Sequence, residues 1–287
     1  MRQLIVNADD LGADGARDDG IFEAIRAGVV TSVSVLANGP TSRDALRHLR
    51  SLRSMNVSPG VHLNLSEGKP LSAGLKLLTG PDGCFLGKAR TQQLLLSPED
   101  TILAGEIAEE VSAQIKALQD EGMEICHLDG HQHVHVFPAA IRVVLEAAEQ
   151  YRIFWMRIPE EPPSPPQSHE CPDDLLKEGR FFSHLAGAAR AQLQGTSVRP
   201  TDYFRGLYFK GRINAPLLQE FAGTIPEGLT ELMVHPGRVA NGRSSGPFSN
   251  FSTVEREQEL EALVHKGFRS ALSKHGIDLT PFPQRRM

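Results

Sequence analysis

Short apolar runs alternate along the chain with segments of helical periodicity or with turn residues. Seven of these runs have the length and composition of buried strands, at residues 4–6, 29–36, 57–65, 125–128, 153–158, 203–209 and 231–234. Such alternation is typical of βα units built around a parallel sheet. We therefore predict an α/β fold of the TIM-like (β/α)-barrel type, which with about seven strands would be incomplete.

Helix signals fall between these runs. Helical patterns are expected at residues 20–27, 41–53, 97–122 and 253–275, and a further helix should begin at Pro138. The pattern at 97–122 has the clearest start, because Pro98 would occupy the first helical position. Residues 66–97 carry Gly and Pro turn signals with weak periodicity, so we predict an excursion over one face of the barrel.

A proline-rich segment interrupts the later part of the chain. Residues 159–166 read Pro-Glu-Glu-Pro-Pro-Ser-Pro-Pro, which is too rich in proline for a helix or a central strand. The strand-and-helix rhythm continues beyond it, so we expect a loop insertion near residues 159–175 and not a domain linker. Residues 1–287 are accordingly predicted to form a single (β/α)-barrel domain.

Composition and charge narrow the class of partner. Hydrophobic residues make up 40% of the chain and charged residues 23%, which is ordinary for a folded globular protein. The net charge of −5 arises from 30 basic and 35 acidic residues without a basic stripe, which argues against a nucleic-acid partner. Three widely spaced cysteines suit a reducing compartment. Without a signal segment or a run of about 18 apolar residues, we expect a cytoplasmic protein with no membrane partner.

Four of the candidate strands end in ionisable residues. They are Asp9 with Asp10, then His62, then the segment from Asp129 to His135, and finally His235. In α/β barrels the carboxyl ends of different strands converge on the active site, so residues far apart in sequence can meet there. We therefore expect these side chains to form one site.

The histidines favour a metal site over a solvated loop. If the segment stayed extended, its period of two would place Asp129, His131, His133 and His135 on one side, and imidazoles suit divalent metals. An isolated His-x-His pair is more often a loop, and a lone histidine such as His62 is more often a core residue. Here, however, the histidines and the aspartate pair occupy equivalent positions at the ends of different strands. This arrangement favours a metal site.

Asp9 and Asp10 are expected to differ in role. Successive side chains on a regular strand point to opposite faces, so two roles are more natural than a shared one. One aspartate can ligate metal while the other acts as base. The structural alternative is a turn in which an aspartate bonds to its own backbone.

Five ordered segments carry a resemblance to a known family. They are IVNADDLG at 5–12, GVVTSVSVLANG at 28–39, GVHLNLSEGKPL at 60–71, HLDGHQHVHVFP at 127–138 and ELMVHPG at 231–237. With these segments the chain resembles the YdjC-like carbohydrate deacetylases, which are related to the polysaccharide deacetylases. The resemblance implies that Asp10, His62 and His131 hold one divalent metal ion, Mg²⁺ or Zn²⁺. It also implies that Asp9 is the catalytic base and that His235 is an acid or a polarising donor.

Further residues are assigned on the same resemblance. Arg157 matches a recurrent arginine, which would bind substrate or pair with an acidic site residue. We also expect His133 and Asp202 to contact substrate, although His133, like His135 and Asp129, would alternatively orient metal ligands.

The expected reaction is hydrolysis of the N-acetyl group of an acetylated sugar or oligosaccharide, giving acetate and an amino sugar. The partner would then be a small-molecule sugar, and barrels of this kind often form homodimers. Two alternatives stay open from the residues themselves. One is another metal-dependent barrel hydrolase, a phosphoesterase or an amidohydrolase, and the other is a non-catalytic carbohydrate-binding protein.

Overall fold

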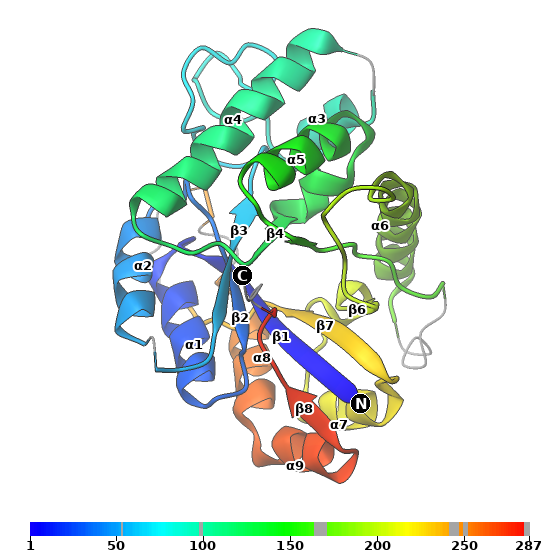
Figure 1. Ribbon diagram of the computed structural model, residues 1–287. Coiled ribbons are helices and arrows are strands. Elements are labelled where there is room, and N and C mark those ends of the chain that lie inside the picture. Colours follow the sequence, from blue (N-terminus) through cyan, green and yellow to red (C-terminus); the bar gives the residue numbers. More distant parts are fainter. Residues whose placement is uncertain (53, 98–99, 164–170, 241–246, 249–251, 284–287) are drawn as a thin grey trace.

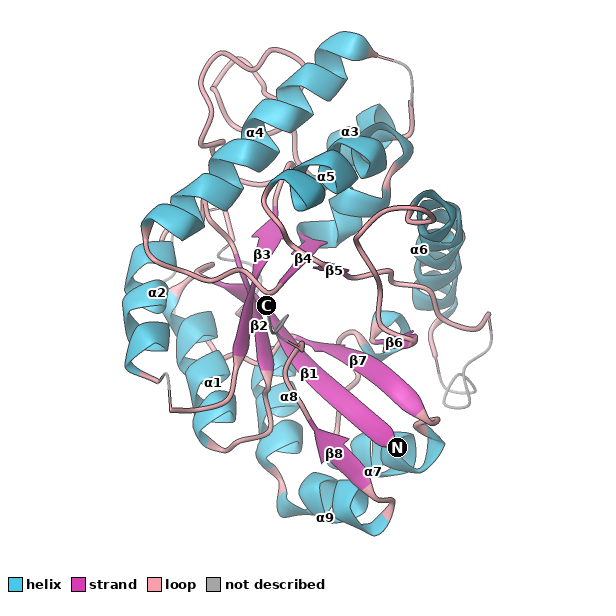
Figure 2. Ribbon diagram, viewed as in Figure 1, coloured by secondary structure: helices cyan, strands magenta, loops and turns pink. Residues whose placement is uncertain are grey.

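The described residues of the computed structural model, 1–52, 54–97, 100–163, 171–240, 247–248 and 252–283, form a curled parallel sheet surrounded by helices. Its strands are β1 (Arg2–Leu11), β2 (Ser32–Val35), β3 (Ser58–Leu63), β4 (His127–Gly130), β5 (Trp155–Met156), β6 (Tyr203–Arg205), β7 (Gly228–Val234) and β8 (Ile277–Leu279). The strand order is β5-β4-β3-β2-β1-β7-β6, and β8 pairs with the start of β1. In these residues β5 and β6 share no ladder, so the predicted incomplete barrel is confirmed (Figure 2).

Helices cover the outside of the curled sheet (Figure 1). Their bounds are α1 (Gly15–Arg26), α2 (Ser42–Ser51), α3 (Lys88–Leu95), α4 (Thr101–Asp120), α5 (Pro138–Gln150), α6 (Asp173–Gln192), α7 (Ala215–Thr224), α8 (Val254–Val264) and α9 (Lys266–Lys274). The predicted helix at 253–275 is in fact two helices, because His265 between them has extended dihedral angles. Helices α3, α6 and α7 and strand β8 had no strong signal in the sequence.

Helix α4 begins later than its sequence signal indicates. The side chain of Asp100 accepts hydrogen bonds from the backbone N–H groups of Ile102 and Leu103, so the helix is capped there. Pro98, predicted at the first helical position, lies outside the described residues. The helix ends at Asp120, and Gly122 follows with φ of 76°, a conformation that favours glycine.

Two buried glutamates of α4 hold the excursion formed by residues 66–87. Glu110 accepts hydrogen bonds from the backbone N–H groups of Leu71 and Ser72, and Glu106 accepts from those of residues 76–78. These contacts satisfy a run of backbone donors that form no strand ladder. They hold in place the segment that leads to Lys88 at the start of α3.

The interior of the barrel changes from apolar to polar along its axis. At the amino-terminal end of the strands, Ile5, Trp155, Leu229 and Phe282 form a small hydrophobic cluster. His127 stacks on Phe282 with ring centroids 4.2 Å apart. Beyond that ring the interior contains buried polar side chains such as those of Ser34 and Asp129, which are hydrogen-bonded at 2.7 Å. Barrels of this type are usually filled by branched aliphatic residues instead. The polar layer lies directly beneath the carboxyl ends of the strands.

The gap between β5 and β6 is bridged by other contacts. The backbone N–H of Met156 donates to the carbonyl of Arg199 at 3.1 Å. Further along, Glu161 Oε1 accepts from the N–H groups of Gly206 and Leu207 at 2.7 and 2.6 Å. Glu161 belongs to the predicted proline-rich loop, whose residues 164–170 lie outside the described part and whose last residues already form the start of α6.

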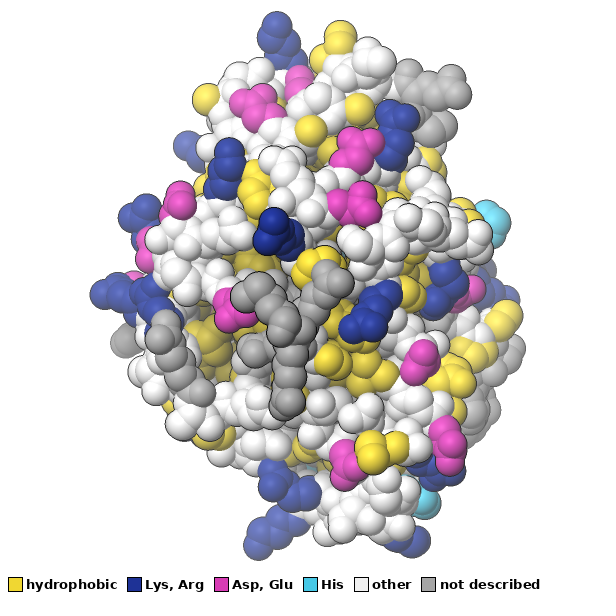
Figure 3. Space-filling model, in the orientation of Figure 1, with side chains coloured by type: hydrophobic (Ala, Val, Ile, Leu, Met, Phe, Trp, Pro, Cys, Tyr) yellow, Lys and Arg dark blue, Asp and Glu magenta, His cyan; other side chains and the backbone are white. Residues whose placement is uncertain are grey.

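The surface seen in Figure 3 carries Lys and Arg side chains interspersed with Asp and Glu side chains, with hydrophobic side chains between them. Within the described part of the chain, no helix combines the length and the apolar character that crossing a membrane requires.

Replacing Glu161 by Gln should remove a pH dependence of stability. Burial raises the pKa of Glu161 to about 7, against the backbone hydrogen bonds that lower it. Between the ordinary pKa of 4.5 and 7 the folded state therefore binds more protons than the unfolded state, and stability is lost as the pH rises through this window. Relative to Glu161→Gln, the wild type should lose about 3 kcal/mol of unfolding free energy between pH 4.5 and pH 8. Urea titrations of both proteins measure this difference, and a pH-independent difference would contradict the assignment.

Candidate metal centre and active site

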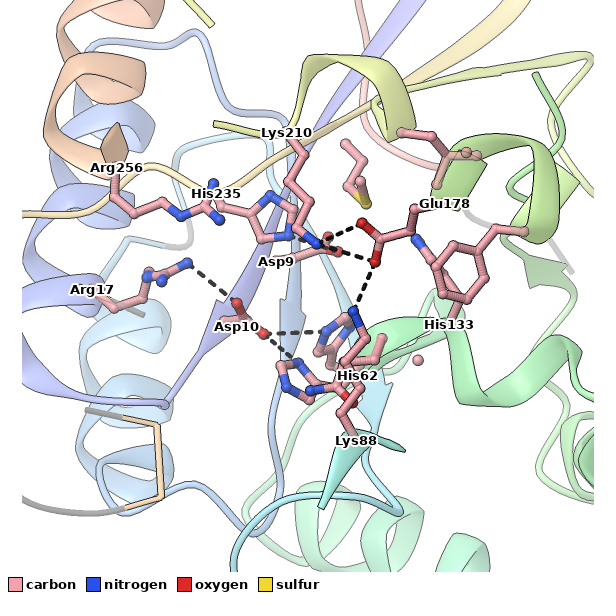
Figure 4. Close-up of a pocket in the computed structure, with 17 residues that line it drawn as sticks. Asp9, Asp10, Arg17, His62, Lys88, His133, Glu178, Lys210, His235 and Arg256 are labelled. Carbon is pink, nitrogen blue, oxygen red and sulfur yellow. Dashed lines mark hydrogen bonds and ion pairs between the residues drawn. The ribbon is translucent and has the colours of Figure 1, made fainter. Parts of the chain in front are cut away.

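The carboxyl ends of β1, β3, β4 and β7 meet at one pocket (Figure 4). Its cavity of about 150 Å³ is lined by Asp9, Asp10, His62, His131 and His235, among others. The convergence expected from the sequence is therefore present, and it follows from the parallel arrangement of the strands.

A bulge at the end of β1 turns both aspartates towards this pocket. The register between β1 and β2 shifts between Ala8 and Leu11, and Asp10 has φ of 68°, in the left-handed region. A bulge breaks the alternation of side chains that a regular strand imposes. Asp9 and Asp10 consequently line the same cavity while contacting different partners.

Asp10 lies between two histidines. Its Oδ1 is 2.8 Å from Nδ1 of His131 and 3.3 Å from Nε2 of His62, and its Oδ2 accepts from Arg17 at 3.2 Å. Nδ1 of His62 is 2.7 Å from Oδ1 of Asp129. Metal-binding histidines are commonly held in this way by a carboxylate on the second ring nitrogen. The Asp10, His62 and His131 ligand atoms all lie within 4.8 Å of one another, so this group fits a divalent ion.

A second group of possible ligands, Asp9 with His62 and Asp129, is also close enough to hold a metal. Arg157, however, already contacts both of these aspartates, at 2.7 and 2.8 Å. A divalent ion about 4 Å from a guanidinium would be repelled by about 8 kcal/mol at an effective dielectric constant of about 20. Asp10 also contacts a guanidinium, that of Arg17, but only through Oδ2, so its Oδ1 stays directed at the two imidazoles. The Asp10 group is therefore better suited to bind a cation.

The segment after β4 does not stay extended, so the predicted alternation of its histidines is wrong. Residues His131–Val136 form a 3-10 turn in which Gln132 and His133 have φ of 52° and 57°. The turn leaves His131 and His133 at the pocket but directs His135 back, where its Nε2 contacts the carbonyl oxygen of Arg157 at 2.9 Å. Gly130 permits this return, because a Cβ there would lie 2.8 Å from Nδ1 of His135.

Arg157 does not reach the pocket, which corrects its expected contact with substrate. It is fully buried below the cavity and donates from both terminal nitrogens to Asp9 at 2.7 Å. It also contacts Asp129 at 2.8 Å and donates from Nε to Glu231 at 2.7 Å. The alternative prediction, pairing with acidic site residues, describes its position.

Asp9 and Asp10 have different electrostatic surroundings, which shift their pKa values in opposite directions. Burial would raise the pKa of Asp10, but His131, His62 and Arg17 hold it well below the ordinary value. For Asp9, burial outweighs the opposing charge of Arg157 and raises the pKa. Asp10 is therefore a persistent anion, whereas Asp9 accepts a proton more readily.

The imidazole of His62 holds a proton firmly when no metal is bound. Burial disfavours its charged form, yet the charges of Asp129 and Asp9 and the hydrogen bond to Asp10 raise its pKa to about 10. A positive charge at this position is thus strongly favoured by the surrounding carboxylates. A metal ion at the same place would replace the proton.

His235 follows β7 and lies at the opposite side of the pocket from His62 (Figure 4). Its Nε2 is 3.9 Å from Oδ2 of Asp9, and its backbone N–H donates to Glu259. Burial lowers the pKa of His235 well below the ordinary value, and the charge of Arg256 acts in the same direction. The imidazole is therefore neutral at pH 7 and able to take up or pass on a proton.

Asp202 lies at the other end of the sheet, so its expected position in the pocket is wrong. It precedes β6, its side chain is exposed, and its Oδ2 accepts from the backbone N–H of Leu229 near the start of β7. The amino-terminal ends of the strands face away from the site.

The pocket has a charged rim that was not predicted from the sequence. Glu178 of α6 accepts from Lys88 Nζ at 2.7 Å and from Lys210 Nζ at 3.2 Å, as Figure 4 shows. Phe182, one turn further along α6, lines the same cavity. Lys88 and Glu178 belong to helices that were not predicted, so no local pattern could have related them to the strand ends.

Comparison with known proteins gives consistent matches over nearly the whole chain. The family model described as YdjC-like protein matches residues 3–274. The chain is 33% identical to a carbohydrate deacetylase of Homo sapiens, with 96% of this chain and 89% of that protein covered. It is 32% identical to a chitooligosaccharide deacetylase of Salmonella paratyphi B, with 96% of each covered.

A solved structure shares the fold. A protein of Enterococcus faecalis V583 whose name refers to cellobiose-phosphate cleavage aligns with a TM-score of 0.74 at 23% identity. The alignment covers 98% of this chain and 97% of that protein.

Replacing Arg157 by Met should strongly destabilise the fold. Asp9, Asp129 and Glu231 would lose their common buried counter-charge, and breaking such a contact costs about 3–5 kcal/mol. The loss should be larger at pH 8 than at pH 5, because the three carboxylates can take up protons in acid. Urea unfolding at the two pH values tests this, and a loss below about 1 kcal/mol at both would show that the cluster is not held by charge.

Proposed function

Because the chain belongs to the YdjC-like protein family, we propose that it is a metal-dependent carbohydrate deacetylase. The substrate would be an N-acetylated sugar or oligosaccharide, and the products acetate and an amino sugar. The observation that carries the proposal is one pocket in which a possible metal group, Asp10 with His62 and His131, lies beside Asp9 and His235. The names of the relatives, carbohydrate deacetylase and chitooligosaccharide deacetylase, support the same reaction.

Asp10, His62 and His131 would hold the metal ion. Two imidazoles and one carboxylate are a donor set that suits Zn²⁺ better than Mg²⁺, which prefers oxygen ligands. When bound, the ion would lower the pKa of a coordinated water and polarise the acetyl carbonyl. Zn²⁺ and Mg²⁺ are the two candidate ions.

Asp9 would act as the base. Its raised pKa suits a group that accepts a proton from the attacking water, and its bidentate contact with Arg157 fixes the orientation of the carboxylate. His235 is neutral at rest, and its Nε2 is 3.9 Å from Oδ2 of Asp9. It would therefore take up the proton that Asp9 accepts from the water and pass it to the departing amine nitrogen. The C–N bond breaks, the oxygen of the water joins the acetyl carbon, and both protons of that water are accounted for in acetic acid and the amine.

The sugar ring would lie between these residues and the rim of the pocket. Lys88, Glu178 and Lys210 retain donors and acceptors beyond their mutual contacts, which suits recognition of sugar hydroxyls. Phe182 and His133, with ring centroids 4.8 Å apart, offer an apolar surface for the ring face. His133 thus keeps its proposed role in substrate contact.

Acetate release tests the function directly. Metal-stripped protein, reloaded with Zn²⁺ or Mg²⁺, should release acetate from N-acetylglucosamine oligomers or their phosphorylated forms. Release of phosphate would instead favour a phosphoesterase, and sugar binding without any release would favour a carbohydrate-binding protein. Either of these outcomes would contradict the proposal.

Asp9→Asn should abolish turnover while leaving the metal bound. The amide keeps the size of the side chain but cannot accept the proton of water, and loss of a general base typically costs about 100- to 10,000-fold in rate. Calorimetric titration with Zn²⁺ should give the same stoichiometry for the variant and the wild type. Asp10→Asn is the matched control, since it should lose metal affinity. Retained activity in Asp9→Asn would remove Asp9 from the role of base.

A further inference from the structure

Glu231 occupies an unexpected place for a carboxylate. It lies on β7, is fully buried in the barrel interior and does not line the pocket. Its Oε1 accepts from Nε of Arg157 at 2.7 Å, whereas its Oε2 has no hydrogen-bond partner among the described residues. Such a position is normally filled by a branched aliphatic side chain. The presence of a carboxylate there therefore needs a physical explanation.

The contact with Glu231 fixes the orientation of the Arg157 guanidinium group. The guanidinium is a planar fork, and its terminal nitrogens already donate to Asp9 and approach Asp129. These contacts all lie at the outer end of the group. Glu231 holds the remaining corner, Nε, so the plane of the guanidinium is set at both ends. The orientation of the Asp9 carboxylate follows from that plane, because both of its oxygens accept from it.

The same contact spans the open side of the barrel. Arg157 follows β5, which is one end of the sheet, and Glu231 lies on β7, next to the other end. His235, four residues after Glu231 and directly after the end of β7, lines the pocket. The contact therefore relates the side that orients Asp9 to the side that carries His235.

We expect Glu231 to act through the position of its acceptor atom, Oε1, more than through its charge. Burial raises the pKa of Glu231 to about 7, and the charge of Arg157 only partly opposes this shift. At neutral pH both protonation states are present, and in either state Oε1 can accept from Nε.

We infer that Glu231 is a positioning residue for the reaction, which acts by holding Nε of Arg157 and thereby aiming the carboxylate of Asp9 at the pocket. The inference rests on the proposed function for its kinetic consequence, while the contact between Glu231 and Arg157 can be tested without any activity.

Two substitutions of Glu231 distinguish the effect of the position of its acceptor oxygen from the effect of its charge. Glu231→Gln keeps the length and an acceptor oxygen but removes the charge, whereas Glu231→Asp keeps the charge but withdraws the acceptor by one methylene group. We expect kcat of Glu231→Gln to stay within about threefold of the wild type, because the hydrogen bond is kept. In Glu231→Asp we expect kcat to fall at least about tenfold with little change in KM, because a small misplacement of a catalytic group is costly.

The matched controls are Glu110→Asp and Glu110→Gln. Glu110 is equally buried and accepts backbone hydrogen bonds on α4, away from the pocket. These variants should lose stability without losing kcat. Zn²⁺ titration should show unchanged stoichiometry in all four variants. A fall in kcat that merely follows the loss of stability, in the Glu110 variants as in Glu231→Asp, would overturn the inference, as would a larger loss in Glu231→Gln than in Glu231→Asp.

A spectroscopic measurement distinguishes failure of this inference from failure of the proposed function. The Nε–H resonance of Arg157, assigned in ¹⁵N-labelled protein with an Arg157→Lys variant, should be protected from hydrogen exchange in the wild type and in Glu231→Gln. It should exchange faster in Glu231→Asp. If the wild type releases no acetate, the deacetylase proposal fails, and this resonance still decides whether Glu231 holds Arg157. Equal protection in all three proteins would overturn the inference.

Discussion

The site depends on one buried arginine. Arg157 is fully buried and contacts three carboxylates, Asp9, Asp129 and Glu231, each within 2.8 Å. A single guanidinium among three acids leaves a local excess of negative charge, which a proton on His62 or a bound cation would offset. The polar interior of the barrel is therefore stable only when Arg157 and the three carboxylates are all in contact. These contacts also determine the positions of the side chains in the site above them.

The different roles proposed for Asp9 and Asp10 follow from this arrangement. Arg157 takes both oxygens of Asp9, so Asp9 is held away from a cation and its raised pKa suits proton transfer. Asp10, one residue later, is turned by the bulge of β1 towards His62 and His131. Adjacent residues in the sequence thus enter two different electrostatic environments, and a base and a metal ligand are the roles that those environments favour.

Much of this arrangement could be predicted from the sequence. Ionisable residues after Val6, Val61 and Val234 lie at strand ends, and parallel strands bring such ends together whatever the details of packing. The turn at Gln132 and His133 could not be foreseen, because left-handed dihedral angles in non-glycine residues leave no clear signal. Glu231 resembles a strand residue in sequence, and its contact with Arg157 joins positions 74 residues apart. Contacts of this range depend on the tertiary fold.

The most direct test of the account is an anomalous-difference map, measured at the zinc absorption edge from crystals of the Zn²⁺-loaded protein. The account predicts one peak within coordination distance of Asp10, His62 and His131, with Asp9 still paired to Arg157. A peak between Asp9, His62 and Asp129, with Arg157 displaced, would contradict it, since the guanidinium would then not determine which aspartate binds the metal.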